Sequence, residues 1–164
     1  EERKHDIDVL ILGTGFNLTE IHSARTIKGR EGITLFEHWR GSPRAFLGTT
    51  IHGFPNFFLL FGPSTGLGHN SVLLMAESQI DHIVRAIQFM KQNHLDELEP
   101  RVETQDNYSK EVDKRMRRTV WASGCMSWYM DATGRNSTLW PGSVRSFRRR
   151  LASFRRRDYI LTHS

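Results

Sequence analysis

Three short apolar runs along the chain predict strands. They lie at residues 8–12, 33–36 and 57–61, and each has the length of a short strand. The last run is continuous rather than alternating, which is typical of a strand covered on both faces. The first run leads into Gly13-Thr14-Gly15, which predicts a tight turn after a buried strand.

Apolar residues three and four positions apart predict two long helices. The first follows an N-cap at Asn70 or Ser71 and fades near Asn93. Its predicted core face consists of Leu73, Ala76, Ile80, Ile83, Ile87 and Met90. The second extends from about residue 103 to 123, with Tyr108, Val112, Met116 and Val120 at every fourth position. Residues 124–144 hold glycines, a proline and aromatic residues, and predict an ordered loop.

The positive charge is concentrated at the C-terminal end. The net charge is +5, and residues 145–164 contain seven arginines and one aspartate. Phe147, Leu151 and Phe154 fall on one helical face among these arginines, which favours a surface helix held by three apolar side chains. No helix-turn-helix, RNA-binding or zinc-finger pattern accompanies the arginines, so nucleic-acid binding is the alternative interpretation.

Several classes of protein are excluded or disfavoured by composition. No apolar run approaches the roughly 18 residues of a membrane span. The single cysteine, Cys125, excludes a disulfide framework and suits a reducing, cytoplasmic compartment. The eight histidines form no tight ligand pair, so no metal site is predicted, and no residue is assigned as a catalytic acid, base or nucleophile.

The strongest chemical signal is the glycine-rich segment between the run at 57–61 and the first long helix. It contains Gly62, Pro63, Gly66, Leu67 and Gly68, followed by His69, Asn70 and Ser71. A strand that ends in such a turn and opens a helix gathers free backbone N–H groups at the positive end of the helix dipole. That arrangement suits a phosphate or an electron-rich ring edge. No lysine follows the last glycine, so the segment is not a nucleotide P-loop, and simple chain reversal is the alternative.

Longer motifs carry a family resemblance. Residues 8–16, D-V-L-I-L-G-T-G-F, resemble the D-x-[VI]-x-x-A-T-G-F motif of flavin-dependent, NADPH-consuming monooxygenases, with Gly13 in place of the usual alanine. G-F-P-N-F-F at 53–58 and G-P-S-T-G-L-G-H-N-S at 62–71 look like a late FAD-domain segment of the Baeyer–Villiger group. The same group's C-terminal signature is similar to S-W-Y at 127–129, G-R-N at 134–136 and L-W-P-G at 139–142. The resemblance covers about residues 6–155.

The resemblance implies a fold and an activity. The chain resembles the C-terminal third of such an enzyme: an α/β, partial FAD/NAD(P)-binding Rossmann-like domain with a C-terminal helix and ordered loop. Residues 1–100 would complete the FAD-binding domain and include the crossover strand, and residues 101–164 would form the helix, aromatic loop and Arg-rich tail. The whole enzyme would use FAD and NADPH to insert one oxygen atom of O₂ into a ketone or heteroatom substrate through a flavin peroxide.

The resemblance also assigns residues to the site. Gly13, Thr14 and Gly15 would form the crossover turn between the nucleotide domains. The backbone of Gly62, Pro63 and Gly66–Ser71 would border the flavin, and Trp128, Tyr129 and Trp140 would wall the substrate side. The partners implied are the remainder of the monooxygenase chain, O₂ and a small organic substrate. The isolated chain is expected to be inactive and colourless; a non-catalytic nucleic-acid module and a non-functional fragment are the alternatives.

Overall fold

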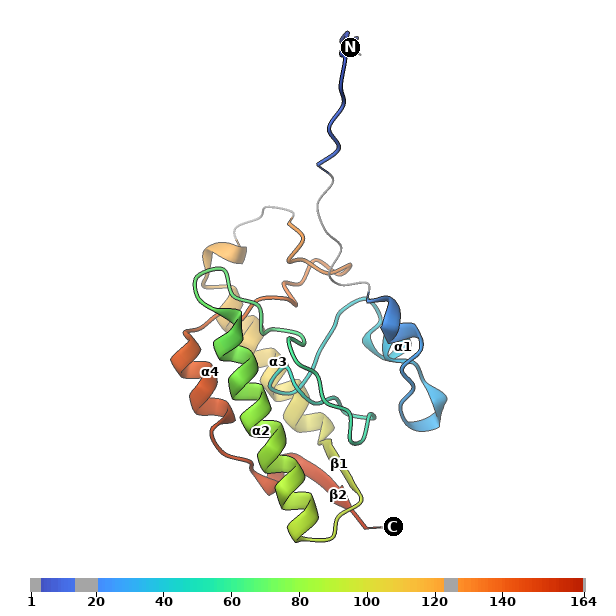
Figure 1. The fold of residues 1–164 in the computed structure, drawn as a ribbon, viewed down its shortest axis with the longest axis vertical. Coiled ribbons are helices and arrows are strands. Elements are labelled where there is room, and N and C mark those ends of the chain that lie inside the picture. Colours follow the sequence, from blue (N-terminus) through green and yellow to red (C-terminus); the bar gives the residue numbers. More distant parts are fainter. Residues whose placement is uncertain (1–3, 14–20, 123–126, 164) are drawn as a thin grey trace.

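The computed structural model describes residues 4–13, 21–122 and 127–163. The longer elements are, in chain order, α1 (Leu35–Trp39), α2 (Val72–Gln92), β1 (Glu97–Pro100), α3 (Val102–Met116), α4 (Val144–Leu151) and β2 (Tyr159–Thr162). Short 3₁₀ turns occur at η1 (His22–Arg25), η2 (Arg30–Gly32), η3 (Val120–Ala122) and η4 (Arg156–Asp158). Figure 1 shows α2, α3 and α4 on one side of a looped region and α1 on the other.

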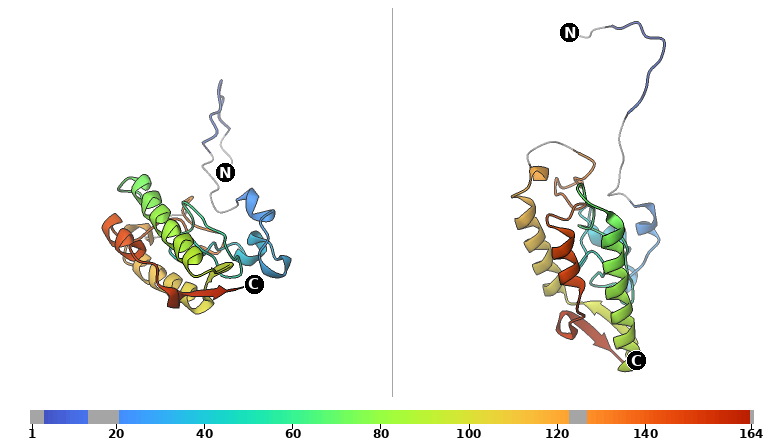
Figure 2. Two further views of the ribbon diagram at one scale, coloured as in Figure 1. Left: turned by 60° about the horizontal axis from the view of Figure 1, so that its bottom comes forward. Right: turned by 60° about the vertical axis from the view of Figure 1, so that its left-hand side comes forward.

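The two strands close one end of the helical layer. β1 and β2 pair antiparallel, with Glu97 opposite Thr162 and Pro100 opposite Tyr159. This pairing joins the start of α3 to the C-terminal end of the chain, and the two views of Figure 2 place the strand pair at the foot of the helices. Within the described residues, this ladder is the only sheet.

The first long helix is confirmed, but of its predicted core face only Ala76 is buried and Met90 packs against the core. α2 begins after Ser71 and ends at Gln92, as the spacing predicts. Its buried side chains are Met75, Ala76, Ser78, Gln79, His82 and Ala86, whereas Leu73 and Ile80 are 66% and 46% exposed. The polar face can be buried because Gln79 is fully hydrogen-bonded: its amide donates to Gly48 O at 2.8 Å and accepts from Phe61 N at 3.1 Å.

The second long helix is confirmed over a shorter range. α3 buries Tyr108, Val112 and Met116, but it ends at Met116, and Val120 is 77% exposed. Thr119 turns the chain back on the end of the helix, since both its amide and its hydroxyl donate to Met116 O, at 2.9 and 2.7 Å. This local side-chain bond competes with a further helical turn.

The strands predicted at 33–36 and 57–61 do not form. Thr34 instead caps α1 in a capping box: its hydroxyl accepts from Glu37 N while the Glu37 carboxylate accepts from Thr34 N. In the second run, Phe58 makes an isolated bridge to Thr50, and Phe61 turns out of an extended path with φ at 55°. Local side-chain capping and backbone turning therefore replace the two predicted ladders.

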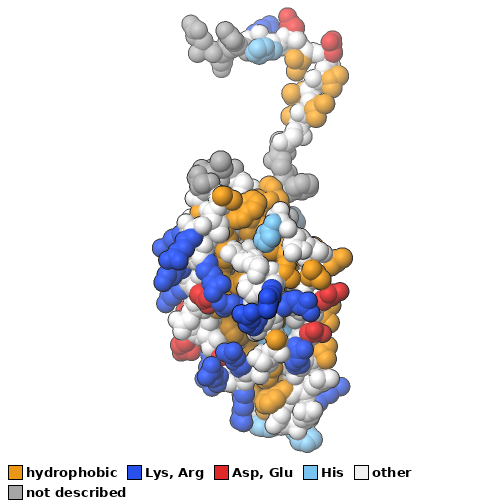
Figure 3. Space-filling view, turned by 90° about the vertical axis from the view of Figure 1, so that its left-hand side faces the viewer, with side chains coloured by type: hydrophobic (Ala, Val, Ile, Leu, Met, Phe, Trp, Pro, Cys, Tyr) orange, Lys and Arg blue, Asp and Glu red, His pale blue; other side chains and the backbone are white. Residues whose placement is uncertain are grey.

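The predicted strand at 8–12 is also absent, because no described segment lies beside it to accept its backbone hydrogen bonds. Residues 4–13 form an extended N-terminal arm. Its apolar side chains are strongly exposed, for example 75% for Val9 and 87% for Ile11. In Figure 3 hydrophobic side chains follow the arm away from the body.

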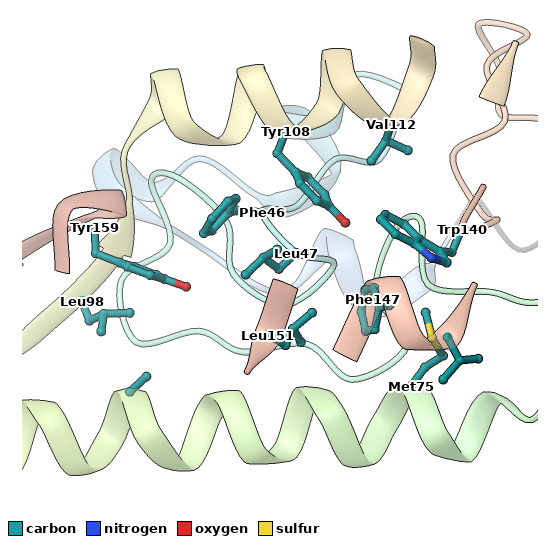
Figure 4. Close-up of a cluster of buried hydrophobic side chains, with 12 residues drawn as sticks. Phe46, Leu47, Met75, Leu98, Tyr108, Val112, Trp140, Phe147, Leu151 and Tyr159 are labelled. Atoms are coloured by element: carbon teal, nitrogen blue, oxygen red, sulfur yellow. The ribbon is translucent and has the colours of Figure 1, made fainter. Parts of the chain in front are cut away.

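The main core lies between α2, α3 and α4. Figure 4 shows Met75 of α2, Tyr108 and Val112 of α3, and Phe147 of α4 converging, together with Phe46, Leu47, Leu98, Trp140, Leu151 and Tyr159. Phe147 and Leu151 are buried as the sequence predicts, and Phe154 packs beyond the helix on Phe89 and Tyr159. A second cluster joins Leu35 and Trp39 of α1 to Ile51 and Phe54.

Candidate functional site

A cavity of about 580 Å³ lies beside the glycine-rich segment. It is formed where two distant parts of the chain meet. Gly66 N donates to Thr138 O at 2.9 Å, and Trp140 N donates to Gly66 O at 2.8 Å, so the segment runs parallel to residues 138–140. Ser64 N donates to Ser137 O at 2.7 Å in the same contact. The residues lining the cavity are Ile21, Trp39, Pro43, Phe61, Gly62, Pro63, Thr65, Gly66, Leu67, Val72, Trp128, Tyr129, Ser137, Thr138 and Leu139.

The backbone amides of the glycine-rich segment fall into two groups. Those of Ser64 and Gly66 are occupied by the chain's own carbonyls. From Leu67 to Asn70, no amide N–H finds an acceptor among the described residues. Ser71 precedes α2 without a capping side-chain bond, so the first turn of this 21-residue helix adds further free donors. Free amides at a helix N-terminus favour negative charge.

The glycines themselves are required by packing within the chain. A Cβ on Gly62 would lie 2.3 Å from Gly48 O, and one on Gly66 would lie 3.0 Å from Thr138 O. A Cβ on Gly68 would lie 2.7 Å from the Trp121 ring. The sequence prediction assigned these glycines to the approach of a ligand; in the structure the atoms that need the space belong to the protein itself.

The structure brings together part of the predicted site. Six of the predicted residues line the cavity: Gly62, Pro63, Gly66, Leu67, Trp128 and Tyr129. His69, Asn70 and Ser71 are exposed at the next turn, at the start of α2. Gly13 ends the N-terminal arm and is not among the residues that line the cavity, and Thr14 and Gly15 are outside the described residues, as is Cys125.

Trp140 does not lie where the sequence predicts it. The sequence predicts that it lies with Trp128 and Tyr129 on the substrate side, but it is 2% exposed and belongs to the main core. Its ring packs edge-on against Phe147 at 5.3 Å between centroids, and its indole N–H donates to Ser143 O. Although Trp140 is near Trp128 and Tyr129 in the sequence, it does not line the cavity.

Trp128 and Tyr129 form the aromatic wall. Their ring centroids are 3.9 Å apart, and Trp121 contacts Tyr129 edge-on at 5.5 Å. Trp128 is 42% exposed, so an apolar surface faces the cavity mouth.

Asp131, which the sequence reasoning missed, fixes the loop behind this wall. One carboxylate oxygen accepts from Thr133 N, Thr133 Oγ1 and Arg135 N, at 2.7–3.1 Å. The other accepts from Ser42 Oγ at 2.8 Å, next to Pro43 in the cavity lining. Burial alone would raise the pKa of Asp131, but the hydrogen bonds from Thr133, Ser42 and Arg135 outweigh it and lower that pKa. The Asp-Ala-Thr-Gly sequence at 131–134 is the signal of such a side-chain turn.

Across the described ranges, no group of three or more histidine, cysteine, aspartate or glutamate side chains is arranged to hold a metal ion. None of the described helices combines the length and apolar character of a membrane span.

The chain shares much of its sequence with known monooxygenases. It is 41% identical over 162 residues to a Baeyer–Villiger monooxygenase of Pseudomonas aeruginosa, covering 98% of this chain and 31% of that protein. A Baeyer–Villiger monooxygenase of Streptomyces coelicolor is 42% identical over 149 residues, covering 88% of this chain and 28% of that protein. The chain is homologous to a segment of the Baeyer–Villiger monooxygenases.

The fold agrees with this homology. A closed crystal structure of cyclohexanone monooxygenase superposes with a TM-score of 0.80 at 26% identity, over 98% of this chain and 31% of that one. Steroid monooxygenase bound to NADP superposes with a TM-score of 0.72 at 29% identity, over 83% of this chain and 26% of that one. No family model matches the chain. The chain thus spans about 30% of the length of the Baeyer–Villiger monooxygenases it matches, and has part of their fold.

Proposed function

We propose that the chain is the C-terminal part of an FAD-dependent, NADPH-consuming monooxygenase that inserts one oxygen atom of O₂ into a ketone or heteroatom substrate. The homology to Baeyer–Villiger monooxygenases supports this activity for the whole protein. Solved relatives carry the expected ligands: one cyclohexanone monooxygenase is bound to NADP⁺, and another enzyme is in complex with FAD and NADP.

The observation that carries the proposal is the position of the glycine-rich segment. It borders a cavity on one side, and beyond Gly66 it presents the amides of Leu67–Asn70 at the start of α2, which have no acceptor among the described residues. These donors fit a flat, electron-rich ring edge, because they favour the negative charge that a flavin gains on reduction. When bound, FAD would supply the oxygen-activating chemistry.

The chain's own residues would bind and orient. The amides of Leu67–Asn70 would hold the flavin edge, and Trp128 and Tyr129 would exclude water from the substrate side. In this proposal the turn at Gly13, Thr14 and Gly15 connects the two nucleotide-binding regions.

Two exposed apolar surfaces support the expectation that the rest of a monooxygenase packs here. One is the N-terminal arm, where Leu10 and Ile11 are 69% and 87% exposed. The other is the outer face of α2, where Leu73, Ile80, Val84 and Ile87 are 40–66% exposed. Contiguous apolar surface of this kind is typical of an interface. We propose that the arm becomes a strand and the outer face of α2 becomes core in a complete Rossmann-like FAD domain, with the boundary near residue 100 as predicted.

A hybrid enzyme tests the activity. The matching segment of the Pseudomonas aeruginosa monooxygenase is replaced by this chain, and the hybrid is supplied with NADPH, O₂ and cyclohexanone. We expect NADPH consumption to depend on the ketone and a lactone to form. The proposed function would be contradicted by a hybrid that folds and retains flavin but oxidises none of the ketones and sulfides offered. Such a hybrid would consume NADPH only to reduce O₂.

A further inference from the structure

A second cleft, separate from the cavity beside the glycine-rich segment, lies between α3 on one side and α4 with the chain that follows it on the other. Its volume is about 660 Å³. α3 contributes Asn107, Tyr108, Glu111 and Arg115, and the other wall carries Arg149, Arg150, Ser153 and Arg155. Figure 3 looks onto the side of the molecule that carries α4, where Lys and Arg side chains gather across the middle of the body.

The charges that line this cleft are unbalanced. Glu111 is shared by two arginines: Arg150 donates to both of its oxygens, and Arg115 lies 2.7 Å from one of them. The hydrogen bonds from Arg150 lower the pKa of Glu111, so the carboxylate is ionised near neutral pH. Asp158, the other lining carboxylate, faces Arg157 at 3.9 Å.

Arg149 and Arg155 remain without an ion-pair partner in the described part of the chain, although both line the cleft. Four arginines therefore face two carboxylates, and both carboxylates already contact a guanidinium. Free guanidinium groups on a concave surface are the side chains that best bind carboxylate and phosphate oxygens.

A buried hydroxyl in the same lining is a second, independent observation. Tyr108 is 6% exposed, and its hydroxyl has no hydrogen-bond partner among the described residues. Figure 4 shows its side chain reaching from α3 toward α4. Buried polar atoms are nearly always paired in native proteins, so an unpaired one beside a cleft indicates a missing acceptor. Burial raises the pKa of Tyr108, which keeps the hydroxyl protonated and able to donate.

We propose that this cleft binds a small oxyanion, a phosphate or carboxylate group, through Arg149, Arg155 and the hydroxyl of Tyr108. The site does not depend on the proposed monooxygenase activity, because none of these residues lines the cavity beside the glycine-rich segment. Two guanidinium groups and one neutral donor on a single concave surface fit a compact anionic group, rather than a long polyanion spread over the basic face.

The test is a titration of the 164-residue chain with inorganic phosphate and, separately, with acetate, followed by amide and arginine NMR shifts at constant ionic strength. Saturable shifts at Arg149, Arg155 and the flanking residues of α3 are expected with one anion or both, and the tighter of the two identifies the chemistry of the natural ligand. Tyr108→Phe keeps the ring and the fold and is expected to weaken binding several-fold. Arg149→Gln with Arg155→Gln is expected to weaken it by about tenfold or more.

A matched control removes the same charge elsewhere. Arg118→Gln with Arg156→Gln changes two exposed arginines that do not line the cleft, and binding is expected to stay within about twofold of the unsubstituted chain. Equal losses in both double variants would show general charge attraction and overturn the site. Absence of saturable shifts with either anion would overturn it too, as would tighter binding of a single-stranded oligonucleotide that the control arginines share.

Discussion

Replacing Asp131 with alanine should loosen the loop that carries the aromatic wall. The side chain is 6% exposed and accepts four hydrogen bonds, three on one oxygen and one on the other. Asp131→Ala would leave the amides of Thr133 and Arg135 without their acceptor in a partly buried turn.

The expected loss of stability follows from the kind of hydrogen bond that the substitution removes. A hydrogen bond to a charged group contributes about 1.5–3 kcal/mol, but bonds that share one acceptor do not add fully. The cost of burying the carboxylate offsets part of the sum. We therefore expect the free energy of unfolding to fall by about 2–4 kcal/mol, a large share of the roughly 5–15 kcal/mol typical of a domain.

The dependence on pH provides a second readout. Because the pKa of Asp131 is lowered in the folded state, its contribution is fully present above the unfolded value of about 3.9 and is lost as the pH falls through the folded value. The difference between the two proteins should therefore shrink in acid.

Urea unfolding followed by tryptophan fluorescence and by far-ultraviolet circular dichroism measures both effects. Asp106→Ala, on α3, is the matched control and should change the free energy by less than about 0.5 kcal/mol. If Asp131→Ala unfolds within about 0.5 kcal/mol of the original chain at neutral pH, with an unchanged denaturant slope, the reasoning about this loop is refuted.

Three further predictions concern the core and the close contacts. Phe147→Ala, at a fully buried ring between α2 and α3, should cost about 3–5 kcal/mol in urea unfolding, and a loss below 1 kcal/mol would mean that the core described here is not formed. Gly48→Ala places a Cβ 2.2 Å from Thr65 Cγ2 at a φ of 64°, so the melting temperature should fall by several degrees. Gly134→Ala is the control: it is also at positive φ, but its Cβ would meet open space, so it should lower the melting temperature less. Burial lowers the pKa of His82, so stability should decline as the pH falls below about 6.5, and this decline should be shallower in His82→Gln; an identical slope in the two proteins would count against a buried neutral imidazole.

Local patterns predicted the helices better than the strands. The periodicity of α2 and α3 and the cluster of Phe147 and Leu151 follow from helical spacing alone, which depends on neighbouring residues. Strands depend on partners far along the chain, and residues 8–12 have none among the described residues. Long-range contacts also explain why the predicted core face of α2 holds only in part. Apolar spacing selects Leu73 and Ile80, which are exposed, whereas Gln79 is buried by hydrogen bonds to Gly48 and Phe61 that no periodicity reveals.

Like the fold, the candidate site could be predicted from the sequence only in part. The glycine-rich segment and the pair Trp128–Tyr129 could be selected from sequence, and the structure places them around one cavity. Trp140 could not be separated from them, because only its contacts with Phe147 and Ser143 show that it is core. Asp131 and Ser42 are 89 positions apart, and their contact becomes visible only in three dimensions.

The flavin content of two purified proteins tests most directly whether the amides of Leu67–Asn70 complete a flavin site. One protein is the 164-residue chain incubated with FAD, and the other is the hybrid in which this chain replaces its counterpart in the Pseudomonas aeruginosa enzyme. We expect the isolated chain to be colourless and the hybrid to be yellow, with about one FAD per molecule. A folded hybrid that loses FAD, or an isolated chain that retains it stoichiometrically, would contradict the account.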